Sequence, residues 1–356
     1  MRIRGFSTTL IVHGRAWSQE MAEAKGAEDP IYCNLRGMSD PMGWLKLWFT
    51  LKKLRPDVIV GVNQTPLIVA VVLRLLGATR ARVISVFHTT YLLEKEMRRF
   101  FLFKWTLRLA DSIVFVSATQ KRVWQERGLS ARRMEVIPNG VDLAGFQPDP
   151  AARARVRAEV GFRNDELVLA LVAAFRPEKN HEQLLHAARS LLDRGQPVRL
   201  LFVGDGPTRP AIEALAATLG LRSIVTFTGS QSDVRPWIAA SDIGVLCSHA
   251  ETFPLSALEF IAMGVPMIMP AIGGTSEIVA DGVNGLLFEP GSNESLTRAV
   301  LTLADPERRA RFAEAATHSA TRFSVESMAD AYRHLLERLM NRSDSALSAS
   351  EASQAL

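Results

Sequence analysis

The sequence predicts an α/β protein built from two doubly wound domains. Apolar, strand-like segments alternate with helical segments between residues 43 and 142, and again more regularly from Leu167 to Ser248. Such alternation is typical of parallel sheets whose strands are joined by helices. The length of 356 residues also exceeds the usual size of a single hydrophobic core. We expect the following division: domains at 1–147 and 148–322, a helix over 323–342, and a disordered tail of small polar residues over 343–356.

The first domain is expected to open with a short strand at Ser7–Val12, before an irregular polar stretch. Apolar periodicity then predicts helices at 43–54, 66–76 and 118–127, and strands at 55–63, 81–90 and 111–117. The segment from Glu94 to Leu109 mixes aromatic and basic side chains, as in an amphipathic helix. Two interpretations stay open: this helix lies on an anionic membrane surface, or it packs on the sheet with a basic face in solvent.

The second domain shows strand patterns at 167–175, 198–204, 224–229, 243–248 and 265–270, and helix patterns at 180–193, 210–220, 234–240, 275–280 and 325–340. A further helix is expected to begin at Pro254, because proline suits the first helical position. This places Glu251 just before that helix and Glu259 inside it. Helix starts that follow strands bind phosphate through unpaired N–H groups, so the stretch predicts a phosphate site flanked by two acids.

Composition limits the classes of protein that fit. Cys33 and Cys247 are the only cysteines, which argues against a disulfide framework or a zinc site and favours a cytoplasmic protein. No signal peptide is visible, and the longest apolar run, Leu67–Leu76, is too short to span a bilayer.

The charge is unevenly divided along the chain. Residues 1–150 carry 22 Lys and Arg against 13 Asp and Glu, while the whole chain has a net charge of +5. This asymmetry predicts an anionic partner for the first domain, such as the inner face of a membrane. Nucleic acid is disfavoured, because no binding motif accompanies the charge.

The stretch from His249 to Gly291, with Glu251, Glu259 and the downstream pattern GG..E.V.DG.NG, resembles the signature of glycosyltransferase family 4. The segment VIPNGVDLAGF resembles the interdomain connection of that family. The resemblance implies a GT-B fold: two Rossmann-like domains that face a central cleft, with the last helix crossing back to the first domain. The first 40 residues lack the glycine-rich loop that it also implies, so we expect a truncated or divergent first βα unit.

The resemblance implies that the protein transfers a sugar from a nucleoside diphosphate sugar to an acceptor hydroxyl, with retention of configuration. Such an enzyme would act in cell-surface polysaccharide or glycolipid assembly, on a sugar or lipid-linked acceptor. Arg176 and Lys179, in the segment AAFRPEKNH, are expected to neutralise the departing diphosphate. We expect no metal and no cofactor, because these cations and the helix start at Leu255 take that role.

The two acids receive different roles from the resemblance. Glu259 is implied to accept hydrogen bonds from the ribose hydroxyls, a task that suits a group with only acceptors. Glu251 is implied to lie against the donor sugar, where a carboxylate stabilises positive charge at the anomeric carbon. Whether Glu251 also acts as a covalent nucleophile stays open.

Other residues complete the expected site. The backbone N–H groups of Phe253, Leu255 and Ser256 are expected to hold sugar and phosphate, and His88 is implied to face the donor sugar across the cleft. Pro254 replaces a glycine that is common in the family and lacks an N–H. Two other functions stay open: a nucleotide-sugar epimerase or hydrolase of the same fold, and a non-catalytic subunit that binds nucleotide sugars.

Overall fold

The computed structural model describes residues 6–12, 31–33, 35, 40–90 and 100–354, and the side chains among them except those of 100, 102 and 342–354. The chain forms two compact units. Unit 1 contains the residues up to Val116, Lys121–Ile137 and those from Ala329 onward; unit 2 contains Ser117–Gln120 and Pro138–Met328. The division after Ile137 lies ten residues before the boundary predicted at 147.

Unit 1 is built on a four-stranded parallel sheet in the order β3-β4-β5-β6. Its strands are β3 (Val58–Val62), β4 (Arg82–Phe87), β5 (Ser112–Phe115) and β6 (Met134–Val136), and its helices are α2 (Pro41–Leu54), α3 (Gln64–Leu75), α5 (Phe100–Leu109), α6 (Ala118–Glu126) and the end of α15 (Val325–Gln354). The short strands β1 (Ile11–Val12) and β2 (Ile31–Tyr32) form a separate parallel pair. Because residues 13–30 lie outside the description, truncation of the first βα unit stays a prediction.

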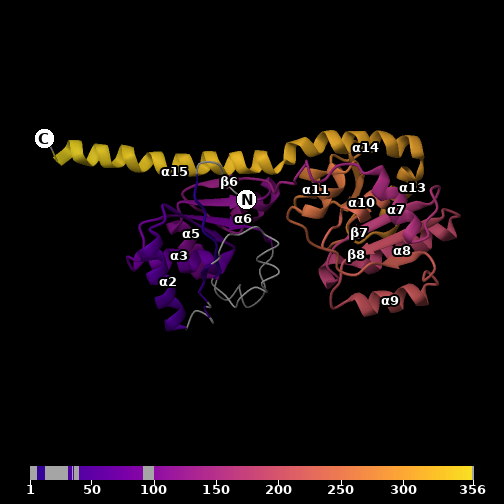
Figure 1. Ribbon diagram of the computed structural model, residues 1–356, viewed down its shortest axis with the longest axis horizontal. Helices are drawn as coiled ribbons and strands as arrows, with labels where there is room; N and C mark the ends of the chain where they lie inside the picture. The colour runs from indigo at the N-terminus through magenta and orange to yellow at the C-terminus, as the bar shows by residue number, and fades with distance from the viewer. Residues whose placement is uncertain (1–5, 13–30, 34, 36–39, 91–99, 355–356) are drawn as a thin grey trace. The chain divides into compact units, whose positions relative to one another are not determined.

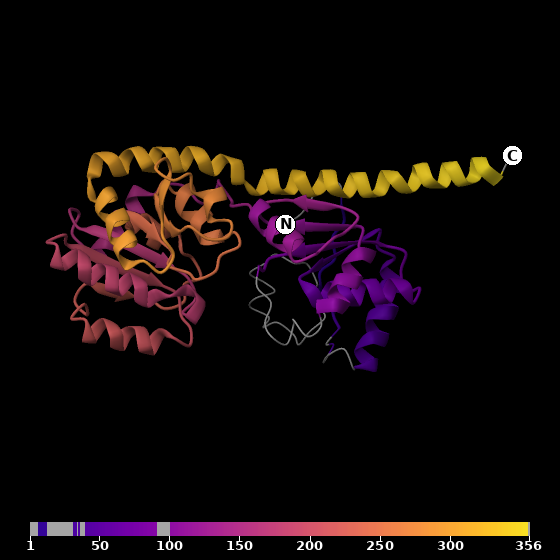
Figure 2. The same cartoon turned by 180° about the vertical axis from the view of Figure 1, so that it is seen from behind.

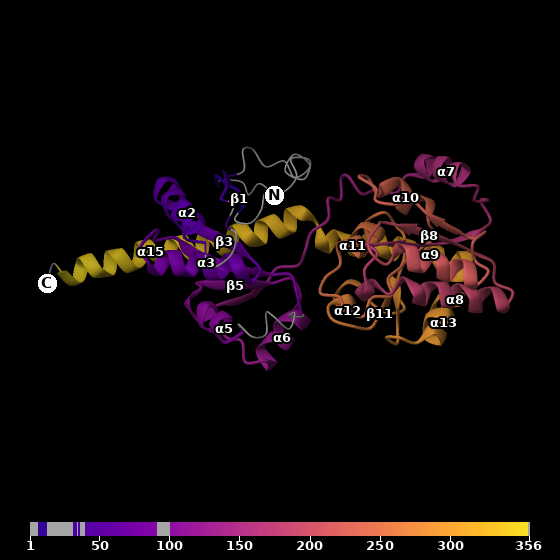
Figure 3. The ribbon, with the colours of Figure 1, turned by 90° about the horizontal axis from the view of Figure 1, so that it is seen from below.

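The helices of unit 1 are positioned by two apolar clusters. Phe103 and Leu107 of α5 pack with α3 and the buried strands β4 and β5. Leu47 and Leu51 of α2 pack with Val69 and Leu73 of α3. Helix α3 therefore lies between α2 and α5, as Figures 1 and 3 show.

Unit 2 is built on a six-stranded parallel sheet in the order β12-β11-β10-β7-β8-β9. The strands are β7 (Leu167–Val172), β8 (Val198–Val203), β9 (Val225–Phe227), β10 (Ile243–Val245), β11 (Met267–Pro270) and β12 (Gly285–Phe288). The helices are α7 (Pro150–Glu159), α8 (His181–Asp193), α9 (Arg209–Thr218), α10 (Arg235–Ala240), α11 (Leu255–Ala262), α12 (Thr275–Ile278), α13 (Asn293–Ala304) and α14 (Pro306–Ala320), with short 3₁₀ turns η1 (Pro177–Lys179) and η2 (Thr321–Phe323). Helices α8 and α13 cover one face of the sheet and α7 and α10 the other (Figure 3).

The predicted fold class is confirmed, since both units are α/β with parallel sheets. Three local predictions were wrong. Helix α3 begins at Gln64, two residues before Pro66. Pro254 is the N-cap of α11, with an extended backbone, and not its first helical residue. In place of a disordered tail, α15 continues as one helix to Gln354, because the alanine, leucine and glutamate of this segment favour helix (Figure 2).

Candidate functional site

The order of the strands in unit 2 places a candidate binding site at the carboxyl ends of β7 and β10. These two strands are neighbours, but the chain continues from β7 towards β8 on one side and from β10 towards β11 on the other. The loops that follow such a pair diverge, which is where open parallel sheets bind ligands. In unit 2 these loops are 173–180 and 246–254. The N–H of His249 donates to the carbonyl of Glu178 at 2.9 Å and joins the two loops.

Lys179 and Glu251, which the sequence assigned to the site, meet at this edge of the sheet. Lys179 Nζ lies 2.7 Å from Glu251 Oε1. The Lys179 side chain is 25% exposed and the Glu251 side chain 6%. The hydroxyl of Ser248, a buried residue, donates to the same carboxylate oxygen at 2.6 Å. Two donors therefore fix Oε1, while no donor to Oε2 is found in the described part of the chain.

Helix α11 begins at Leu255, four residues after Glu251, with its amino end at the same edge of the sheet. Leu255 is exposed and Ser256 half-buried, and the N–H groups of a first helical turn have no acceptor within the helix. Phe253 is buried, and its carbonyl accepts a hydrogen bond from the Asn139 side chain at 2.9 Å. The helix thus presents backbone donors and the positive end of its dipole next to Glu251.

Glu259 lies one helical turn further along α11. Its side chain is half-buried, and burial raises the pKa of its carboxyl above the ordinary value. A partly buried carboxylate with few hydrogen-bond donors around it can accept hydrogen bonds from a pair of ligand hydroxyls.

Glycines allow neighbouring loops to approach the acid. A Cβ on Gly273 would overlap the carbonyl of Glu251, and a Cβ on Gly274 would overlap that of Thr252. The loop after β8 shows the same feature, because a Cβ on Gly204 would overlap the carbonyl of Ala173. The glycine pair of the GG..E.V.DG.NG pattern and Gly204 therefore allow close backbone packing around the candidate site.

Beneath Lys179, a buried histidine starts α8. The ring of His181 stacks on Phe175 with centroids 4.1 Å apart, and within the described residues neither ring nitrogen has a hydrogen-bond partner. Burial, and then the Lys179 cation, lower the pKa of His181 to about 4. The imidazole is therefore neutral near pH 7 and acts as an aromatic support for the loop that carries Lys179.

The remaining predicted residues are less constrained. Arg176 lies at the start of η1 with an exposed side chain, so it is free to move towards a ligand. His88 follows β4 in unit 1, where it is exposed and its N–H donates to Asn63 Oδ1 at 3.3 Å. His249 is exposed and contributes the backbone hydrogen bond described above.

Sequence reasoning missed two residues of this site. Ser248 follows the end of β10 by three residues, and a serine three positions before an acid at a strand end was the available signal. Asn180 adopts a left-handed backbone with φ of 49°, and its amide donates to Gln183 Oε1 at 3.0 Å. The sequence pattern placed Asn180 inside the helix predicted at 180–193, although asparagine tolerates the left-handed conformation better than most residues.

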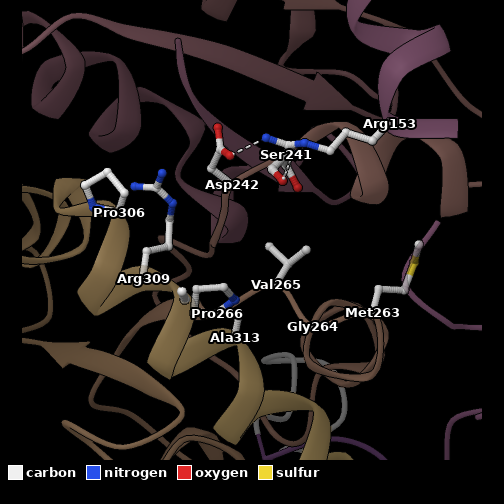
Figure 4. A pocket seen from close by; sticks show the side chains of 11 residues that line it. Arg153, Ser241, Asp242, Met263, Gly264, Val265, Pro266, Pro306, Arg309 and Ala313 are labelled. Carbon is white, nitrogen blue, oxygen red and sulfur yellow. Dashed lines mark hydrogen bonds and ion pairs between the residues drawn. The ribbon is translucent and has the colours of Figure 1, made fainter. Parts of the chain in front are cut away.

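A concavity of unit 2, of about 340 Å³, lies at the opposite edge of the sheet and is shown in Figure 4. There Arg153 donates to Asp242, which precedes β10, at 2.6 Å. The buried Arg157 donates to the same carboxylate and to the carbonyls of Ala240 and Glu166. These contacts attach α7 to the amino ends of the strands, so this edge stabilises the fold while the carboxyl edge carries the candidate site.

The described residues show neither a metal cluster nor a membrane-spanning helix. They contain no group of three or more His, Cys, Asp or Glu side chains arranged to hold a metal ion. None of the helices formed by them is long and apolar enough to cross a membrane.

Two family models match the chain. The model described as "Glycosyl transferases group 1" matches residues 152–319, and the model described as "Glycosyltransferase Family 4" matches residues 1–144. A relative from Segniliparus rotundus, named D-inositol 3-phosphate glycosyltransferase, is 35% identical over 232 residues, which cover 62% of this chain and 51% of the relative. The chain spans about half to three fifths of the curated relatives it matches.

Solved structures share the fold. A glycosyltransferase from Rickettsia africae is similar with a TM-score of 0.81 at 21% identity, covering 94% of this chain and 91% of that one. Anabaena Alr3699/HepE in complex with UDP-glucose gives a TM-score of 0.80 at 22% identity, covering 90% and 88%. With both parts of the chain matched by glycosyltransferase models and the fold shared with solved glycosyltransferases, the chain belongs to the GT-B glycosyltransferases of family 4, also described as glycosyl transferases group 1.

Proposed function

We propose that the protein transfers a sugar from a nucleoside diphosphate sugar to an acceptor hydroxyl with retention of configuration. The observation that carries this proposal is the grouping of Lys179, Glu251 and Ser248 beside the amino end of α11. It supplies a mobile cation, a fixed carboxylate and backbone donors at one edge of a parallel sheet. The UDP-glucose held by the similar Anabaena protein supports a nucleotide sugar as the donor.

In this proposal the diphosphate of the donor lies at the amino end of α11. The N–H groups of Leu255 and Ser256 donate to phosphate oxygens, and Lys179 leaves Glu251 to neutralise the charge that develops on the leaving diphosphate. Arg176 is close in sequence and free to approach the same group. The reaction then needs no metal ion or cofactor, since these groups stabilise the departing diphosphate. Glu259 accepts hydrogen bonds from the ribose.

Glu251 is assigned to the sugar. Once Lys179 moves to the phosphate, Ser248 still holds Oε1, so Oε2 is the oxygen that faces positive charge at the anomeric carbon or a sugar hydroxyl. The N–H of Phe253 is a further candidate for a sugar contact, and the role that the resemblance implies for His88 stays a prediction.

We further propose an acceptor of cell-surface polysaccharide or glycolipid assembly, either a sugar or a lipid-linked one. The relatives named D-inositol 3-phosphate glycosyltransferase are consistent with a polyhydroxyl acceptor. Of the segment expected to contact a membrane, residues 94–99 lie outside the described residues. Phe101 and Trp105 are exposed, whereas Phe103 is buried against Phe87, so α5 offers fewer aromatic side chains to a membrane than the sequence predicts.

The test is to incubate the purified chain with a panel of UDP-, GDP- and ADP-sugars and to measure released nucleotide, with and without lipid-linked acceptors. We expect release with one class of donor, stimulated by acceptor. NMR of the product should show the anomeric configuration of the donor. Inversion would refute the retaining mechanism. Release that is independent of every acceptor would favour a hydrolase, and nucleotide binding without turnover would favour the non-catalytic alternative.

A further inference from the structure

The segment 252–254, which leads from Glu251 into helix α11, is held by two residues that are distant in sequence. The side-chain amide of Asn139 donates to the carbonyl of Phe253 at 2.9 Å. The ring of Phe253 is buried and meets the ring of Phe323 edge-on, with centroids 5.5 Å apart and planes at 70°. Both anchors belong to unit 2, although neither lies on its sheet. One therefore fixes the backbone of Phe253, and the other fixes its side chain.

The two anchors are joined to each other through the backbone. Next to Asn139, the N–H of Val141 donates to the carbonyl of Phe323 at 2.8 Å, and the N–H of Val325 donates to the carbonyl of Val141 at 3.0 Å. The backbones come this close because Gly140 has no side chain: a Cβ there would lie 2.7 Å from the Cα of Val325. Since these contacts already join the two segments, the amide of Asn139 is not needed for that purpose.

The hydrogen bond from Asn139 completes a row of contacts to three consecutive carbonyls. The glycine pair 273–274 packs against the first two, those of Glu251 and Thr252, because a Cβ on either glycine would overlap the carbonyl that it faces. The third carbonyl is that of Phe253, which accepts the amide N–H. The whole connection between the acid and the helix is therefore held in one geometry.

The local sequence explains why Phe253 needs an anchor. Pro254 follows it as the N-cap of α11, and this N-cap makes no side-chain hydrogen bond to the helix. Such a bond would otherwise fix the entry of the chain into the helix. Proline also restricts the residue before it to extended backbone, which couples the directions of the carbonyl and the N–H of Phe253. A donor that fixes the carbonyl therefore fixes the N–H as well.

We propose that Asn139 is a positioning residue for the sugar end of the donor. It holds the Phe253 carbonyl, and thereby sets the Phe253 N–H and the nearby Glu251 carboxylate at the distance and direction that the transferred sugar needs. In this role Asn139 acts through Phe253 and requires no contact with the donor. The inference rests on the proposed function, because it assumes a sugar beside Glu251. A displacement of about 1 Å in such groups can lower a rate about a hundredfold.

The test compares Asn139→Asp with the natural full-length chain, using the nucleotide sugar that the natural chain accepts. The variant keeps the size of the side chain but removes the N–H that the Phe253 carbonyl accepts. We expect kcat to fall about tenfold or more, while KM and the affinity for the nucleoside diphosphate change less than about threefold. Steady-state kinetics and calorimetric titration measure these quantities. General damage to unit 2 would weaken nucleotide binding as well, so this split separates positioning from folding.

Asn284→Asp is the matched control. The Asn284 amide donates to the carbonyl of Ile278 at 3.0 Å, also within unit 2, but Asn284 precedes β12 and so lies at the amino edge of the sheet, away from the candidate site. This variant should have a lower Tm and an unchanged kcat at a temperature where it is folded. An equal loss of kcat in both asparagine variants would make Asn139 structural and overturn the proposal.

A second variant tests the route through Phe253. Phe323→Leu removes the ring contact without leaving a polar group unpaired, and it should lower kcat with nucleotide affinity retained. Combined with Asn139→Asp, the two losses should be less than additive, because both changes release the same residue. Fully additive losses would mean two independent effects and would refute this route.

Hydrogen exchange followed by mass spectrometry gives a readout that does not depend on activity. Amides in a peptide that covers residues 251–258 should exchange about tenfold faster in Asn139→Asp than in the natural chain, and at the natural rate in Asn284→Asp. Unchanged exchange in Asn139→Asp would refute the anchoring role. A natural chain that transfers no sugar would refute the proposed function and this inference together, whereas an active natural chain whose Asn139→Asp variant keeps its kcat would refute this inference alone.

Discussion

Replacing Lys179 by alanine should have two separable effects, because the ammonium pairs with Glu251 at 2.7 Å and is also proposed to meet the diphosphate. The first effect is on binding. A charge-assisted hydrogen bond contributes about 1.5–3 kcal/mol, so affinity for a nucleoside diphosphate should fall by about ten- to a hundredfold. Affinity for the nucleoside without phosphates should not change. Calorimetric titration with UDP, GDP and their nucleosides measures both.

The second effect is on the free energy of unfolding. Removing one partner of a buried ion pair costs about 3–5 kcal/mol, but Lys179 is a quarter exposed and Ser248 still donates to the acid, so we expect about 2 kcal/mol. In a Glu251→Gln background this cost should largely vanish, because no buried charge is left unpaired, while the loss of diphosphate affinity should persist. Urea unfolding of the single and double variants tests this difference.

The ion pair of Arg199 and Glu166 provides a matched control at the opposite edge of the sheet. Its atoms lie 2.9 Å apart, with side chains 24% and 9% exposed, close to the values for Lys179 and Glu251. Arg199→Ala should lower stability by a similar amount and leave diphosphate affinity unchanged. Unchanged diphosphate affinity in Lys179→Ala would remove this lysine from the site. An equal stability loss in both Glu251 backgrounds would refute the role of the pair.

Three further predictions concern the acids and the buried histidine. Glu251→Gln should reduce sugar transfer about a hundredfold while nucleotide affinity is retained, and an equal collapse of nucleotide binding would make Glu251 structural. Glu259→Gln should raise the free energy of unfolding at pH 7, because burial raises the pKa of this carboxyl and its charged form opposes folding. The same change should weaken nucleotide binding. A variant that is less stable than the natural chain would contradict the expected stabilisation. The free energy of unfolding of the natural chain should fall by about 3 kcal/mol between pH 6.5 and about 4, because the unfolded imidazole of His181 takes up a proton there and the buried one does not. The variant His181→Leu should not show this fall. Urea midpoints that change in parallel for both proteins over this range would refute the prediction.

Much of the fold could be predicted because its strands are strongly apolar. Runs such as Leu167–Leu171 and Leu200–Val203 are buried on both sides of a parallel sheet, which leaves a continuous apolar signal. Helix α7 gave no such signal, since PAARARVRAE lacks a clear apolar stripe. Its fully buried Arg157 is stabilised by hydrogen bonds to carbonyls distant in sequence, and only the folded chain brings these together.

The candidate site divides in the same way. Lys179 and Glu251 could be predicted because each lies in a motif next to a strand end, but their ion pair spans 72 residues of chain. The role of Ser248 depends on the direction in which the Glu251 carboxylate points, and the sequence alone does not give that direction. Gly273 and Gly274 could be recognised as a pair in the sequence. The sequence did not show that another loop packs directly against the backbone at these two positions.

Unit 1 is assembled from both ends of the chain, which has a consequence for synthesis on the ribosome. The part of α15 from Ala329 belongs to unit 1, where Arg338 pairs with Glu135 at 3.0 Å, and Leu335, Leu336 and Leu339 of this helix are buried. Unit 2 is almost entirely continuous, so its residues have all been translated by Met328. A nascent chain therefore holds every strand of unit 2 before the helix that completes unit 1 exists. Chains that terminate early between Met328 and Leu339 would carry a complete unit 2 beside a unit 1 with exposed apolar surface, a species that chaperones and proteases recognise.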